Sequence, residues 1–263
     1  RRLARQPPAT GARAGNVKTA LVTDLHANRE AVETVMAHAR EQGAQAWAFL
    51  GDFVGYGADP AWVVDMVREH VAQGAVAVQG NHDLATVLGA NPMMRIEART
   101  VIEWTRAQLD EPQLEFLRTL PMSQRRDDHL YVHANAYAPD QWEYLLNANL
   151  ALRSMLATEC RYTFCGHLHE QRLFHAGETG RAGEYLPRPG APIMLRNDRR
   201  WLVIPGSTGQ PRDGNPAAAY ALFDGAENSI TYHRVAYDHA RAADKIRGAG
   251  LPLRLAARLL TGH

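Results

Sequence analysis

Five short polar clusters in this sequence combine residue types that bind transition metals. Carboxylate, amide and imidazole side chains together suit manganese, iron, zinc or cobalt. Each cluster follows an apolar, β-rich run that predicts a strand, at 17–23, 46–50, 75–79, 130–132 and 162–165. The clusters are Asp24-Leu25-His26, Gly51-Asp52, Gly80-Asn81-His82-Asp83, His133 and Gly166-His167-Leu168-His169.

The position of these clusters at strand ends predicts that they meet. Loops beyond the carboxyl ends of strands in an open α/β sheet converge on one crevice. Residues two apart on an extended chain point the same way, so Asp24 with His26, and His167 with His169, are expected to serve one site. The glycines at 51, 80 and 166 would let the backbone turn sharply before each ligand. One histidine alone would more often be an ordinary residue, but five clusters together predict a metal site.

The elements that must position these clusters begin with alternating strands and helices. Apolar residues at three- and four-residue steps predict a helix over 28–42, capped by Asn28 and ended by Gly43, and a second helix over 60–73. This alternation predicts βαβ units with parallel strands. A further helical region is expected over 140–158 and an exposed loop over 177–192. Later strands, suited to hairpins and a second mixed sheet, are expected at 173–175, 193–195, 201–204, 218–223 and 230–235.

Composition favours one globular domain. The 263 residues are 46% hydrophobic, and 29 basic against 28 acidic side chains leave a net charge of +1. Neither a basic stripe with interleaved aromatics nor a membrane-spanning run is visible, so nucleic acid and membrane partners are not expected. We expect a mobile leader over 1–16, a catalytic domain over 17–235, and a helical tail over 236–263 packed on that domain.

Two cysteines, Cys160 and Cys165, do not make a disulfide framework in a chain of this length. They are expected to be buried thiols in a reducing, cytoplasmic compartment. The oligomeric state stays open.

The order of the five clusters resembles that of the calcineurin-like metallophosphoesterase superfamily over essentially the whole folded chain. Three further segments, at 51–60, 205–214 and 249–252, resemble segments of the small bacterial phosphodiesterases of this superfamily. The resemblance implies an α/β fold, a four-layer αββα sandwich of two mixed β-sheets flanked by helices. It also implies two divalent or mixed-valence ions (manganese, iron, zinc or cobalt). One ion would be held by Asp24, His26 and His169, the other by Asn81, His133 and His167, with Asp52 bridging both.

The mechanism implied by the resemblance is in-line attack of a metal-bridging hydroxide on phosphorus. His82 resembles the family's general acid, which protonates the leaving oxygen. Its orienting partner is left open between Asp83 and Asp59. The chain departs from the commoner family pattern at Ala134-Asn135, at Leu168 and at Ile204, none of which removes a ligand.

The expected substrate is a small phosphodiester or nucleotide phosphoester, with dinucleoside polyphosphates as a specific case. In the family pattern, protein phosphatases carry an Asp-Arg pair where this chain has Gly55-Tyr56. A phosphoprotein is therefore a less expected substrate than a small phosphodiester. The alternatives are a phosphomonoesterase, a phosphoprotein phosphatase and a non-catalytic binding scaffold.

Arg212 is expected to contact substrate phosphate, with Tyr56 as a weaker companion. This expectation depends on strand 201–204 lying beside the strand before His167, as sequential strands often do. The alternative is a surface arginine bonded to Asp213.

Overall fold

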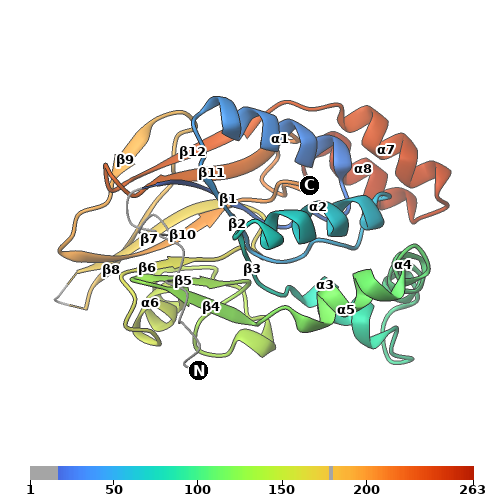
Figure 1. Cartoon of the computed structure of the whole chain (residues 1–263), viewed down its shortest axis with the longest axis horizontal. Helices are drawn as coiled ribbons and strands as arrows, with labels where there is room; N and C mark the ends of the chain where they lie inside the picture. The colour runs from blue at the N-terminus through green and yellow to red at the C-terminus, as the bar shows by residue number, and fades with distance from the viewer. Residues whose placement is uncertain (1–16, 178–179) are drawn as a thin grey trace, which may run out of the picture.

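The computed structural model of the protein describes residues 17–177 and 180–263. The leader predicted over 1–16 lies outside these residues. Two six-stranded sheets form the centre of the described part (Figure 1). The first sheet has the order β3 (Val76–Ala77), β2 (Ala46–Phe49), β1 (Lys18–Val22), β11 (Ala218–Asp224), β12 (Ser229–Val235) and β9 (Pro192–Met194). The second has the order β4 (Ser123–Arg126), β5 (His129–Val132), β6 (Tyr162–Phe164), β10 (Arg199–Pro205), β7 (Gln171–Gly177) and β8 (Ala182–Tyr185).

Both sheets are mixed, and the five strands that lead into the predicted ligands are among their parallel strands. β1, β2 and β3 run parallel, as do β5, β6 and β10, while the remaining neighbours are antiparallel. The pairing of β10 with β6 confirms that strand 201–204 lies beside the strand before His167. The carboxyl ends of five ligand-bearing strands therefore open toward one region.

Helices cover the outer faces of the two sheets. α1 (Arg29–Glu41) and α2 (Pro60–Ala72) pack on the first sheet, and α6 (Ala148–Leu156) packs on the second from the opposite side (Figure 1). β1 shows why both faces are apolar: Ala20 and Val22 join the core under α1 and α2, whereas Leu21 joins the core between the sheets. α1 begins where expected, because the side chain of Asn28 accepts a hydrogen bond from the backbone N–H of Ala31 at 3.2 Å.

Three helices gather at one end of the molecule, α3 (Asn81–Leu88), α4 (Ile96–Ala107) and α5 (Glu111–Thr119) (Figure 1). The C-terminal helices α7 (His239–Gly248) and α8 (Leu253–Thr261) share an apolar cluster with Val101 of α4. Lys245 of α7 also pairs with Glu30 of α1 at 2.5 Å. The tail thus contacts two helices of the main body.

Two expectations about local structure were wrong, and one helix was missed. The helix predicted over 140–158 contains only the end of a 3₁₀ turn, Pro139–Gln141, and α6, because Trp142 adopts a left-handed conformation (φ 55°) between them. β8 lies within the loop predicted over 177–192 and pairs with β7. α3 was not predicted, and it begins directly at the ligand candidate Asn81.

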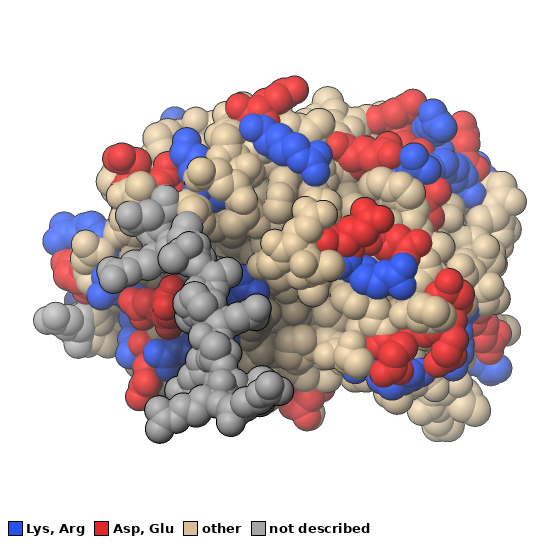
Figure 2. All heavy atoms as spheres, in the orientation of Figure 1, with Lys and Arg blue, Asp and Glu red and all other residues tan. Residues whose placement is uncertain are grey.

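Cys160 and Cys165 are buried free thiols, as expected. Of the helices in the described ranges, none has both the length and the apolar character that a membrane crossing requires. Basic and acidic side chains are interspersed over the described residues of the face drawn in Figure 2, where neither sign forms a continuous stripe.

Candidate metal centre

The loops after β1, β2 and β6 hold their ligand candidates in a strained backbone conformation. Asp24, His26, Asp52, His167 and His169 all have positive φ, between 45° and 67°. Side-chain-bearing residues in this region cost on the order of 1–3 kcal/mol each, and such strain concentrates at functional sites. The expectation that these pairs converge by extended two-residue spacing was therefore wrong. They converge through tight left-handed turns instead.

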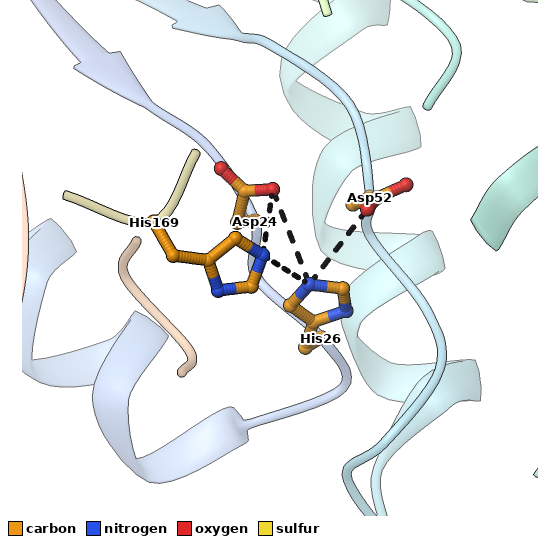
Figure 3. A group of neighbouring side chains, drawn as sticks. All are labelled: Asp24, His26, Asp52 and His169. Atoms are coloured by element: carbon orange, nitrogen blue, oxygen red, sulfur yellow. Dashed lines mark hydrogen bonds and ion pairs between the residues drawn. The ribbon is translucent and has the colours of Figure 1, made fainter. Parts of the chain in front are cut away.

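Four of these side chains form a first group, Asp24, His26, Asp52 and His169, which point toward one another (Figure 3). Nε2 of His169 lies 3.2 Å from Nε2 of His26 and 3.2 Å from Oδ1 of Asp24. Nε2 of His26 lies 3.7 Å from Oδ2 of Asp52. Two nitrogens and two carboxylate oxygens thus surround a common point.

A second group shares Asp52 with the first. Oδ2 of Asp52 lies 3.4 Å from Nε2 of His133. The same nitrogen lies 3.2 Å from Nδ1 of His167 and 3.2 Å from Oδ1 of Asn81. Asp52 therefore belongs to both groups, and its Oδ2 faces a histidine of each.

Each of the four histidines holds its other ring nitrogen against a backbone carbonyl oxygen. A carbonyl only accepts, so that nitrogen carries the proton and the opposite nitrogen presents a lone pair to the centre. The pairs are His26 Nδ1 with Val54 (3.1 Å), His133 Nδ1 with Leu50 (2.7 Å), His167 Nε2 with Trp142 (2.9 Å) and His169 Nδ1 with Gln210 (2.6 Å). Lone pairs that face one another at 3.2 Å are unfavourable unless a metal ion or a proton lies between them.

Asp24 supplies a second sign that a cation belongs here. Its Oδ2 accepts hydrogen bonds from Oγ1 of Thr23 and the backbone N–H of His167, both at 3.0 Å. Its Oδ1 is buried and has no hydrogen-bond partner among the described residues. An unpaired buried carboxylate oxygen is costly unless it binds a metal. The donor set of carboxylates, imidazoles and an amide oxygen fits a divalent transition metal.

The family model of the calcineurin-like phosphoesterase superfamily domain matches residues 17–228. The chain belongs to this superfamily. An uncharacterized protein of Methanocaldococcus jannaschii is 32% identical over 250 residues, which are 93% of this chain and 98% of that protein.

Solved structures have the same fold. A metallophosphoesterase from Sphaerobacter thermophilus matches with a TM-score of 0.84 and 32% identity, covering 94% of this chain and 100% of that one. A hypothetical protein from Pyrococcus horikoshii matches with a TM-score of 0.75 and 19% identity, covering 94% and 99%, and shows the fold alone. The predicted superfamily and its two-sheet α/β architecture are confirmed. The protein is a metal-dependent phosphoester hydrolase with a buried Asp/His cluster for divalent metal ions.

The carboxylates of the phosphoesterase centre stay ionised despite burial. Burial raises the pKa of Asp52, but the charges of His133 and His82 outweigh it and hold that pKa well below its usual range. Burial lowers the pKa of His133, but the charge and hydrogen bond of Asp52 outweigh it and raise that pKa to about 9. In the metal-free protein a proton on His133 therefore takes the place of part of the missing positive charge.

Two of the predicted ligand-loop glycines provide space rather than a turn. Gly51 has φ 91°, as a sharp turn requires. Gly80 and Gly166 do not have positive φ, but a Cβ on Gly80 would collide with Asp52, and one on Gly166 with Thr23. Ligand loops approach each other too closely there for any side chain.

His82 lies at the edge of the phosphoesterase centre. Its backbone N–H donates to Oδ1 of Asp52 at 2.8 Å. The half-buried ring packs 5.0 Å from the ring of His26 and 4.4 Å from that of Tyr56, measured between centroids. Burial lowers the pKa of His82. Gly55 makes room for it, since a Cβ at that position would lie only 2.6 Å from Nδ1 of His82.

Neither carboxylate considered as the orienting partner of His82 bonds to its ring. Asp83 is buried and accepts backbone N–H groups of Asp52, Phe53, Val54 and Gly80 at 2.8–3.3 Å. Asp59 pairs with Lys245 at 2.9 Å. Asp83 instead ties the loop after β2 to the start of α3, and packing against Gly55 and Tyr56 positions His82.

Arg212 lies next to the centre. Its backbone N–H donates to the carbonyl of His169 at 3.2 Å, and its guanidinium donates to Oε1 of Gln210 at 3.0 Å. The guanidinium carbon lies 5.7 Å from the ring centroid of Tyr56. Asp213, the surface partner in the alternative reading, pairs with Arg234 instead. Arg212 and Tyr56 are thus neighbours beside His82 and His169.

Sequence reasoning missed two aromatic residues of the segment between Gln141 and Asn147. Trp142 supplies the carbonyl that holds His167. The partly exposed ring of Tyr144 stacks on that of His167 at 4.0 Å and 11°. Both were missed because the sequence analysis assigned this segment to a helix. The signal that could have found them was a pair of aromatic residues between Pro139 and Asn147, which caps α6.

Proposed function

We propose that the protein is a two-metal phosphodiesterase that hydrolyses small or nucleotide phosphoesters. The observation that carries this proposal is the orientation of the four imidazoles. Each has one nitrogen bound to a backbone carbonyl and the other turned toward carboxylate oxygens. Asp52 faces both groups, so two adjacent ions would share its carboxylate.

The ligands divide into two sets on this proposal. Asp24, His26 and His169 would hold one ion, and Asn81, His133 and His167 the other. When bound, two divalent ions lower the pKa of coordinated water towards ~7 and neutralise charge on the phosphoryl oxygens. Manganese, iron, zinc and cobalt all suit these ligands.

His82 would donate the proton that the leaving alkoxide needs. It lies beside the centre without being one of the converging donors, and its backbone is bonded to the shared carboxylate of Asp52. A histidine holds and releases a proton near neutral pH. The close contact with Gly55 restricts where its ring can lie.

Arg212 would bind a non-bridging phosphate oxygen. Within the described ranges no carboxylate pairs with its guanidinium, and its backbone is bonded to His169. An unpaired guanidinium next to a metal centre suits an anionic substrate. Tyr56 packs against His82 and under Arg212, so its ring would limit the space available to the substrate beside these two residues.

A metal-reconstitution assay tests the proposal. Protein stripped by chelator is reloaded separately with manganese, iron, zinc or cobalt, and its metal content is measured. Turnover is then compared on bis-p-nitrophenyl phosphate, p-nitrophenyl phosphate, a phosphopeptide and a dinucleoside polyphosphate. We expect about two ions per chain and the highest kcat/KM on diesters. Preference for the monoester or the phosphopeptide would favour those alternative activities. If the protein with its full metal content hydrolyses none of these substrates, the non-catalytic binding scaffold is the alternative that remains.

A further inference from the structure

The segment 135–147, here named the aromatic strap, is held in place by one buried side chain. Asn135 is fully buried. Its Oδ1 accepts a hydrogen bond from the backbone N–H of Ala138 at 2.8 Å, and its Nδ2 donates to the carbonyl of Glu143 at 3.2 Å. The buried Leu145 joins the apolar core between α6 and the second sheet. The strap is therefore closed on itself at one end and anchored in the core at the other.

The aromatic strap contacts both histidines of the second ligand group. The carbonyl of Trp142 accepts a hydrogen bond from Nε2 of His167 at 2.9 Å. The ring of Tyr144 stacks on the ring of His167, with centroids 4.0 Å apart and planes 11° apart. The ring of Trp142 packs 5.8 Å from that of His133. The hydrogen bond thus turns Nδ1 of His167 toward the centre, and the stacked tyrosine restricts the plane of the same ring.

The histidines of the first group are held by other segments. His26 bonds to the carbonyl of Val54, and His169 bonds to the carbonyl of Gln210. In residues 17–177 and 180–263, none of the hydrogen bonds or ring contacts of these two histidines involves the strap. The two groups share the carboxylate of Asp52 but have separate supports for their imidazoles.

We propose that the aromatic strap sets the affinity of the second ion, the one assigned to Asn81, His133 and His167, separately from that of the first. This inference rests on the proposed function, because it takes these three residues as the ligands of one ion. The residues of the strap are positioning residues, which act through His167. A histidine that is already oriented loses less freedom when it binds a metal, and its bonded carbonyl raises the basicity of the free nitrogen. Removing such support typically costs 10–100-fold in metal affinity.

The test is a manganese titration of chelator-stripped wild type, Tyr144→Ala, Tyr144→Phe and Asn135→Ala, with free manganese measured by its EPR signal. We expect two bound ions in wild type. Tyr144→Ala and Asn135→Ala should each weaken one of them by at least ~10-fold and leave the other unchanged. Tyr144→Phe should bind both as wild type does, because it keeps the stacked ring. In a His167→Ala background, which lacks the second site, adding Tyr144→Ala should have no further effect.

Tyr185→Ala is the matched control. Tyr185 of β8 is exposed to a similar degree as Tyr144, 45% against 40%, and its ring packs 5.2 Å from that of His175, which is not a ligand candidate. It should bind both ions with wild-type affinity. Equal weakening of both ions by Tyr144→Ala, or wild-type affinity at both sites, would overturn the inference. If Asn135→Ala does not fold, Tyr144→Ala decides, since its partly exposed ring can be removed without opening a cavity in the core.

Metal binding and turnover separate this inference from the proposed function. A wild type that binds two ions but hydrolyses no ester refutes only the proposed function, and selective loss of one ion in Tyr144→Ala still supports the role of the strap. A wild type that binds two ions and hydrolyses diesters, with variants that bind both ions normally, refutes the role of the strap alone. A wild type that binds a single ion refutes both.

Discussion

The close approach of Gly55 to His82 makes Gly55→Ala a test of how the proposed proton donor, His82, is positioned. Gly55 has φ 83°, where alanine costs roughly 1–2 kcal/mol. Its new Cβ would lie 2.6 Å from Nδ1 and 3.2 Å from Cγ of His82. Ordinary contacts begin near 3.4 Å, so the ring would have to move by nearly 1 Å. Tyr56 and His26 pack against it and restrict the directions available.

A misplacement of this size costs about 10²-fold in rate where geometry controls the reaction. We expect Gly55→Ala to keep its metal, to lose about 1–2 kcal/mol of unfolding free energy, and to lose about 10²-fold in kcat on an ester with a poor leaving group. The measurements are metal analysis, chemical denaturation and steady-state kinetics on alkyl and nitrophenyl esters.

Gly74→Ala is the control, because Gly74 has φ 101° but an added Cβ there has no neighbour within 4 Å. It should lose similar stability with unchanged kinetics. Wild-type turnover of the alkyl ester by a metal-loaded Gly55→Ala protein would refute the role given to the ring position of His82.

Four further predictions follow from the same centre. Asp52→Asn should leave the fold intact and lower activity by at least ~10²-fold, because both metal groups share its carboxylate; normal turnover at full metal content would contradict this. His82→Ala should retain metal and lose more activity on alkyl esters than on nitrophenyl esters, whose leaving groups need no proton; equal loss on both argues against a proton donor. Arg212→Ala should lower kcat/KM at unchanged metal content, and Arg212→Lys should restore it only in part. Wild-type kinetics in the alanine variant would show that Arg212 does not contact the substrate. His133 has a folded pKa of about 9 against 6.5 unfolded, so in the metal-free protein its contribution to stability is present below pH 6.5 and is lost as pH rises through about 9. Manganese added near pH 7.5 should therefore release about one proton from His133, measured with a pH indicator, and equal release from His133→Ala would exclude this source.

Local pattern was enough to predict the elements that carry the centre. The cap at Asn28, the proline that begins α2 and the ligand clusters that follow β1, β2, β5 and β6 depend on neighbouring residues, which the sequence displays directly. Pattern failed between Gln141 and Asn147, because a distant contact overrides helical periodicity there. Trp142 turns left-handed and its carbonyl holds His167, a residue 25 positions away.

The sequence by itself determined which donors exist and that they follow strands, since residue type and strand period are local properties. Only the tertiary structure decided how they combine. His26 and His169, 143 positions apart, share one group, while His167 joins His133 in the other. The same holds for Asp83, whose chemistry suited an orienting role but whose carboxylate is occupied by four backbone N–H groups. These arrangements depend on contacts between segments far apart along the chain, which residue spacing does not encode.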